Sequence, residues 1–125
     1  MTRSLALACL MASVLPGCAS SGERVATPGQ PIVLQVGERI ALPDDSSLRY
    51  IAVTADSRCP PGAQCIRAGD ADVAFEYTAP GATATRVTLN LPRSPTSPAG
   101  DWQLHLLSLE HGDKPAATVR FDPSR

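Results

Sequence analysis

Two cysteines that lie close together are the residues of this chain best suited to chemistry. They are Cys59 and Cys65 in the segment DSRCPPGAQCIRAG, with five residues rich in turn formers between them. Such a pair can bind a metal, exchange electrons or form a disulfide. A structural zinc site needs four ligands, and the spacing of the soft candidates His105 and His111 is not a ligand motif. A redox pair prefers Cys-x-x-Cys at a helix start, so a disulfide is the leading prediction.

Charged residues surround the two cysteines. Asp56, Asp70 and Asp72 flank the loop, with Arg58 and Arg67 as possible partners, although solvated rim charges are the simpler interpretation. Asp56 can also close a local turn onto the backbone ahead of Cys59. We therefore define a candidate binding loop with these members: Asp56, Arg58, Pro60, Pro61, Gly62, Gln64, Arg67 and Gly69.

The sequence contains no recognisable catalytic constellation. Neither His105 nor His111 is flanked by residues typical of a nucleophile elbow or an oxyanion hole. We therefore predict no enzymatic activity, no catalytic residue, no metal site and no cofactor. The 11 basic and 12 acidic residues nearly balance, and the basic ones are scattered singly, which argues against a nucleic-acid partner.

The first residues are typical of an export signal. Arg3 is the only charge before an apolar run from Leu5 to Leu15, which is too short to span a bilayer as a helix. The run ends in Leu15-Pro16-Gly17-Cys18, which resembles the lipobox of bacterial lipoproteins. The resemblance implies that the sulfur of Cys18 takes a diacylglyceryl group and that the chain is cut before this residue. Ala19 in place of Asp implies the outer membrane, with the domain facing the periplasm.

This leader sets the environment of the two loop cysteines. Acyl chains on Cys18 would make the lipid bilayer a partner, whereas an ordinary cut after Ala19 would release a soluble protein. Exported proteins meet an oxidising compartment. Since Cys9 lies in the leader and Cys18 takes the lipid, Cys59 and Cys65 should form a disulfide that stabilises the fold by about 2 kcal/mol.

The chain divides into three parts. Residues 1–17 form the predicted signal peptide. Residues 18–30 are small and polar, which predicts a flexible tether. Residues 31–125 have the length of one domain with a modest core.

Apolar residues of this domain alternate with period two, which is typical of strands with one buried face. We expect about seven short strands in a single antiparallel β-sandwich, with an Ig-like arrangement or a small barrel as the alternative. Clear alternation occurs at Ile32/Leu34/Val36, Ile40/Leu42, Val73/Phe75/Tyr77, Val87/Leu89/Leu91 and Val119/Phe121.

The sequence also predicts four local details of the strands and connections. Residues 32–42 should form a hairpin or a bent strand, and Ile51 and Val53 should share the buried face of their strand. A β-bulge near Leu106 and Leu107 should turn five apolar side chains of residues 102–109 inward. Residues 93–101 should form a long connection between strands.

The cysteine loop also resembles a motif of uncharacterised small exported proteins and lipoproteins of bacteria. The resemblance covers roughly residues 36–77 and implies no activity, and Arg67 stands where the motif often has Trp. It suggests that Gly69 takes a backbone angle closed to other residues. The matching positions are Asp56, Ser57, Arg58, Cys59, Pro60, Cys65, Ile66, Ala68 and Gly69.

Two classes of function remain. The first is a non-catalytic binding or accessory module of the cell envelope, whose rigid loop contacts another envelope protein or a peptidoglycan fragment. The second is an inhibitor of the lysozyme or protease type that inserts the loop into a cleft. A purely structural loop, with the partner surface elsewhere, for instance on residues 93–101, is a third interpretation.

Overall fold

The computed structural model describes residues 17 and 23–124, and this part of the chain contains eight strands and no helix. Cys18 and nearly all of the predicted leader lie outside the described residues. The strands are β1 Ile32–Leu34, β2 Arg39–Ala41, β3 Ser47–Asp56, β4 Ala71–Thr78, β5 Thr85–Leu91, β6 Thr96–Ala99, β7 Trp102–Leu109 and β8 Ala117–Pro123.

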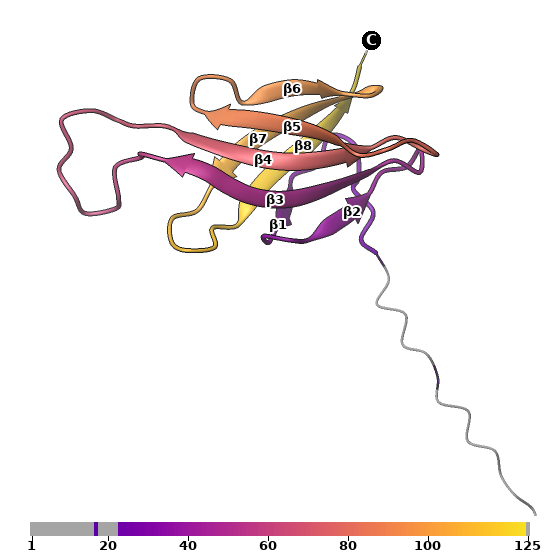
Figure 1. Ribbon diagram of the computed structural model, residues 1–125, viewed down its shortest axis with the longest axis horizontal. Coiled ribbons are helices and arrows are strands. Elements are labelled where there is room, and N and C mark those ends of the chain that lie inside the picture. The colour runs from indigo at the N-terminus through magenta and orange to yellow at the C-terminus, as the bar shows by residue number, and fades with distance from the viewer. Residues whose placement is uncertain (1–16, 18–22, 125) are drawn as a thin grey trace, which may run out of the picture.

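The eight strands form two antiparallel sheets of four strands each. Their orders are β1-β8-β7-β6 and β2-β3-β4-β5. Figure 1 shows the two layers, with β3 and β4 in front of β7 and β8. Buried side chains from both sheets meet in one apolar core. The predicted all-β antiparallel sandwich is therefore confirmed.

The chain changes from one sheet to the other at two corners. Between β1 and β2 it turns at residues 35–38, leaves β8 as its partner and joins β3, so residues 32–42 form two strands of different sheets and neither the hairpin nor one continuous bent strand. Between β5 and β6 the corner is closed by two backbone hydrogen bonds that join Asn90 and Ser94, at 2.9 and 3.0 Å. Both long sides of the sandwich are thereby linked.

The residues just before β1 lie against the domain. Val25 pairs in parallel with Ala41 at the outer edge of β2, and Ala26 is only 2% exposed. The Gly29 amide donates to the Phe121 carbonyl at 2.8 Å. An open strand edge offers unpaired backbone groups, and these residues satisfy some of them. The part of residues 18–30 that the structure describes is thus attached to the sandwich and is not free chain.

The core follows most of the alternation in the sequence. Val73, Phe75 and Tyr77 are buried on β4, as predicted. On β3 the prediction holds for Val53, which packs partly buried against the core, and is wrong for Ile51, while Leu48 and Tyr50 are fully buried. The pairing of β3 with β4 shifts register twice after Tyr50, and each shift breaks the period of two.

Strand β7 contains the predicted bulge. The register shifts between Leu106 and Ser108, but Leu107 is 41% exposed, so four of the five apolar side chains point inward and not all five. The extra residue of a bulge is unpaired and its side chain here turns to solvent. The net effect is that Leu109 returns to the core.

One strand falls where the sequence indicated a connection. Within residues 93–101, β6 pairs with β7 at the edge of its sheet. Pro98 lies in this strand, and an edge strand tolerates proline because one row of its backbone groups needs no partner in the sheet. The predicted long connection is therefore wrong, and the strand count is eight.

Candidate binding loop

The loop between β3 and β4 projects from one end of the sandwich. Figure 1 shows it beyond the last strand residues, at the end opposite to the point where the described chain enters the domain. Cys59 and Cys65 form a disulfide, with their Cα atoms 5.8 Å apart. The predicted disulfide is confirmed, and it closes the projecting part of the loop into a small ring.

The ring contains a tight turn. The Ala63 amide donates to the Pro60 carbonyl at 3.1 Å, and Gly62 has a φ of 80°. Proline at the second turn position and glycine with positive φ at the third define a type II turn. Pro61 therefore fixes φ at the second position of the turn, and Gly62 permits the positive φ at the third.

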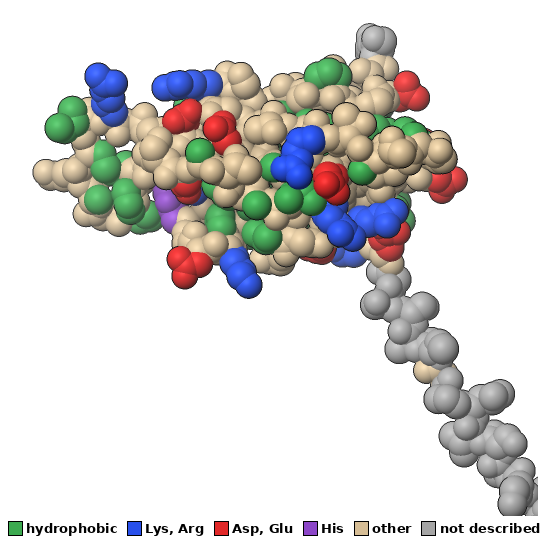
Figure 2. Space-filling view, viewed as in Figure 1, with side chains coloured by type: hydrophobic (Ala, Val, Ile, Leu, Met, Phe, Trp, Pro, Cys, Tyr) green, Lys and Arg blue, Asp and Glu red, His purple; other side chains and the backbone are tan. Residues whose placement is uncertain are grey.

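The tip of the loop offers its side chains to solvent. Residues 60–68 are all exposed, and the Ile66 side chain is 103% exposed. Gln64 and Arg67 are exposed beside it. The tip thus combines apolar and polar side chains on a rigid ring, and Figure 2 shows apolar groups gathered on this projection.

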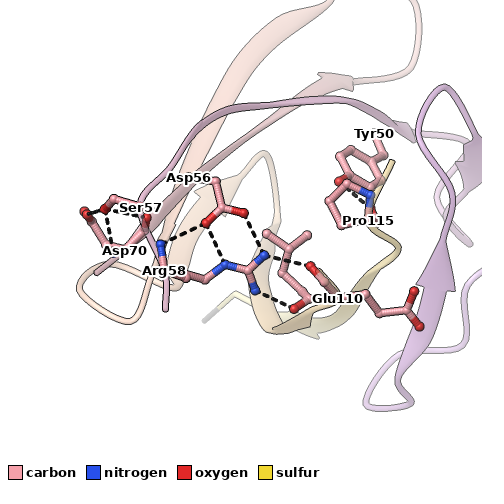
Figure 3. A network of polar contacts seen from close by, with 8 residues as sticks. Tyr50, Asp56, Ser57, Arg58, Asp70, Glu110 and Pro115 are labelled. Atoms are coloured by element: carbon pink, nitrogen blue, oxygen red, sulfur yellow. Dashed lines mark hydrogen bonds and ion pairs between the residues drawn. The ribbon is translucent and has the colours of Figure 1, made fainter. Parts of the chain in front are cut away.

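Arg58 fastens the base of the loop to the other sheet. Its guanidinium donates two hydrogen bonds to the Asp56 carboxylate, from Nε at 3.0 Å and from Nη2 at 2.8 Å. It also donates to the Leu109 carbonyl at 2.6 Å and to the Glu110 carbonyl at 2.7 Å (Figure 3). The Arg58 side chain is only 14% exposed. The interpretation as a solvated rim charge is therefore wrong for Arg58, whereas Asp56 is an exposed residue held in an ion pair.

The charge of Arg58 changes the acidity of its partner. Hydrogen bonding from the guanidinium holds the pKa of Asp56 below its ordinary value. The Arg58 amide also donates to Asp56 at 3.0 Å, which is the local turn expected from the sequence. Nearby, the Tyr50 hydroxyl donates to the Pro115 carbonyl at 2.7 Å, and burial raises the pKa of Tyr50. The Tyr50 contact joins β3 to the segment that follows β7.

A second cluster ties the two ends of the loop together. The Ser57 amide donates to the Asp70 carbonyl at 2.8 Å, and the Asp70 amide donates to the Ser57 hydroxyl at 3.1 Å. The Asn90 side chain donates to the carboxylates of Asp70 and Asp72, both at 2.7 Å. Hydrogen bonds from Asn90 and Ser57 lower the pKa of Asp70. The loop therefore leaves and re-enters the sheet at a closed base.

Gly69 is needed at this base for a reason other than the predicted one. It is not among the glycines with positive φ. A Cβ atom at this position would instead lie 1.7 Å from the Ser57 carbonyl oxygen. Close approach of two backbone segments, and not an unusual backbone angle, requires glycine here.

The two histidines lie away from the loop tip. The His105 ring lies between the Thr96 hydroxyl, 3.0 Å from Nδ1, and the Asp122 carboxylate, 2.9 Å from Nε2. His111 lies in the exposed connection after β7. Among the described residues, no group of three or more His, Cys, Asp or Glu side chains is placed to hold a metal ion. In the same part of the chain, no helix has the length and apolarity to cross a membrane.

No protein-family model, no curated protein and no solved structure matches this chain.

The sequence identified the loop but not the role of its most connected residue. Arg58 reaches carbonyl groups 51 and 52 positions away in the chain. Its only local signal is Asp56 two residues earlier, a spacing that many surface pairs share. Asn90 was missed altogether, since nothing in its neighbourhood connects it to the loop.

Proposed function

We propose that the protein is a non-catalytic binding module of the bacterial cell envelope, anchored through an acylated Cys18 and acting through the disulfide-closed loop. The outer membrane, with the domain facing the periplasm, is the proposed location. The partner is another envelope protein or a peptidoglycan fragment.

The position of the loop is the observation that supports this proposal. The chain enters beside Ala41, which pairs with Ser47 at the start of β3, and the loop follows the end of the same strand. β3 has 10 residues, which at about 3.3 Å each separates the two ends by roughly 30 Å. A domain tethered at its first residues would therefore present the loop on the side away from the bilayer.

The construction of the loop also favours binding. A tip that is rigid before contact loses little conformational entropy on binding. Fully exposed apolar side chains such as Ile66 gain the most from burial against a partner. Arg58 holds the base of the loop rigid, and the disulfide between Cys59 and Cys65 holds the tip rigid.

The intact mass of the protein from its native membrane tests the anchor and the disulfide. We expect a diacylglyceryl adduct at Cys18, with Cys59 and Cys65 alkylated only after reduction. A chain without lipid would contradict the anchor, and free alkylation of both loop thiols would contradict the disulfide.

Site-specific crosslinking in the native membrane tests the loop. A photoreactive amino acid in place of Ile66 should give one adduct, whereas the same amino acid in place of Leu107, an exposed apolar residue on the sandwich, should give none. Excess wild-type chain should suppress the adduct, and excess Ile66→Asp chain should not. Equal adducts at both positions, or none at position 66, would refute a role for the tip.

The convex and rigid tip also favours the second candidate, an inhibitor that inserts this loop into an enzyme cleft. Inhibition of lysozymes and serine proteases by the purified chain would support it, provided that replacing Pro61, Gly62 and Ala63 together abolishes the inhibition. Absence of inhibition would dismiss the inhibitor and leave the binding module in place.

A further inference from the structure

A row of charged side chains crosses the outer face of the β2-β3-β4-β5 sheet. The register places Arg39 opposite Arg49, Arg49 opposite Glu76, and Glu76 opposite Arg86. Their neighbours in sequence, such as Ile40, point into the core, so the row faces outward. Figure 2 shows basic side chains gathered, with acidic ones between them, on this face.

The pairing of Arg39 with Arg49 is unfavourable by itself. Like charges directly opposite each other on neighbouring strands destabilise a sheet. Arg39 is balanced by Glu23, 3.0 Å away, and Arg86 lies 3.8 Å from Glu76. Within the described residues, Arg49 has no carboxylate at ion-pair distance. Arg49 shares Glu76 with Arg86, so three arginines face two glutamates and one positive charge of the row is left uncompensated.

A hollow opens beside this uncompensated charge. Its lining comprises Arg39, Ser47, Arg49, Glu76 and Thr78. Ser47 is paired with Thr78, so two hydroxyl groups lie next to the two arginines on the same face. Guanidinium and hydroxyl groups together provide the hydrogen-bond donors that a tetrahedral oxyanion requires. Glu76 also lines the hollow and disfavours an extended polyanion, so the hollow suits one small anionic group.

We propose that this hollow is a binding site for a single phosphate group, held between Arg39 and Arg49. An anion there would neutralise the uncompensated charge and relieve the repulsion between the two guanidinium groups. The site is independent of the loop, which lies at the other end of β3.

The site lies at the end of the domain where the chain enters. Arg39 contacts Glu23, and five residues of extended chain from Cys18 reach at most about 17 Å. If the anchor of the proposed function is correct, the hollow lies close to the lipid headgroups, whose phosphates are the nearest source. Inorganic phosphate in solution is the other source of the same chemistry.

Nuclear magnetic resonance of the full chain in a neutral detergent tests the site. With increasing inorganic phosphate at constant ionic strength, the side-chain Nε–H signals of Arg39 and Arg49 should shift and saturate. Chloride should not reproduce the shift. Arg49→Gln should weaken phosphate binding about tenfold, the loss of one charge-assisted contact. Arg67→Gln, which removes the same charge on the remote loop, should leave it unchanged.

A second arm identifies the source of the phosphate. Binding to vesicles of phosphatidylcholine is compared with binding to vesicles that also contain phosphatidylglycerol, for the wild type, Arg49→Gln and Arg67→Gln. A preference for phosphatidylglycerol that only Arg49→Gln removes assigns the site to headgroups, and saturable binding of inorganic phosphate alone assigns it to the free ion. No saturable shift, or an equal shift with chloride, overturns the site, and neither result bears on the loop.

Discussion

The tip and the base of the loop are built in opposite ways. The tip is exposed throughout residues 60–68, and one covalent bond between Cys59 and Cys65 closes it. The base contains the partly buried Arg58 and many hydrogen bonds to distant backbone groups. Side chains of the tip can therefore be replaced at little cost to the stability of the fold, whereas the base determines where the tip points.

Replacement of Arg58 should have the largest effect. Arg58→Ala leaves the Asp56 carboxylate without its partner and removes the donors of the Leu109 and Glu110 carbonyls, so we expect a loss of about 3 kcal/mol in the free energy of unfolding. Urea unfolding measures it. Arg67→Ala at the tip is the matched control and should change stability by less than about 0.5 kcal/mol. Equal effects of the two substitutions would contradict the distinction between base and tip.

A methyl group added at the base of the loop should lower the free energy of unfolding more than one added at the tip. Gly69→Ala places a Cβ atom against the Ser57 carbonyl, and the required backbone shift should destabilise the protein by about 2 kcal/mol. In Gly62→Ala the Cβ meets nothing within 4 Å, and only the positive φ of the turn resists it, at about 1 kcal/mol. Urea midpoints of the two variants rank the costs, and a reversed order would show that the base is not closely packed.

Removal of the disulfide should loosen the tip of the loop and leave the hydrogen bonds of the base intact. The double variant Cys59→Ser/Cys65→Ser should lose at most about 2 kcal/mol, because the ring it opens is small. Hydrogen exchange should still protect the Ser57 amide, which bonds to Asp70 outside the ring, while the Ala63 amide should lose its protection. Loss of protection at both amides would mean that the ring organises the base as well.

Low pH should weaken the Asp56–Arg58 ion pair at the base of the loop, with a smaller effect on stability than the substitutions above. The folded-state pKa of Asp56 is lowered, so its stabilising contribution is complete above the ordinary carboxyl range, near pH 4, and is lost as the pH falls through the lower folded value. Urea midpoints from pH 6 to pH 2 should therefore fall less steeply for Asp56→Asn than for the wild type. Arg58→Ala should show the same reduced slope, and an unchanged slope in both variants would place the acid sensitivity elsewhere.

The same contrast between local and distant information runs through the whole fold. The strands that alternate most clearly, such as Val73 to Tyr77 and Val119 to Phe121, could be located from sequence because burial of one sheet face imposes a period of two. The disulfide could be predicted because two cysteines separated by turn-forming residues pair by default in an oxidising compartment, which the leader-like first residues led us to expect. These inferences need only neighbouring residues.

The tertiary structure alone decided the features that depend on distant pairing. A bulge on β3 leaves Ile51 without a partner and brings Val53 opposite the buried Val73, and an edge position lets β6 form around Pro98. The partners of Arg58 are carbonyl groups far along the chain, and the arginine pair on β2 and β3 exists only because of the register between those strands. Periodicity describes which face of a strand is buried, but register and sheet order follow from the packing of the complete core.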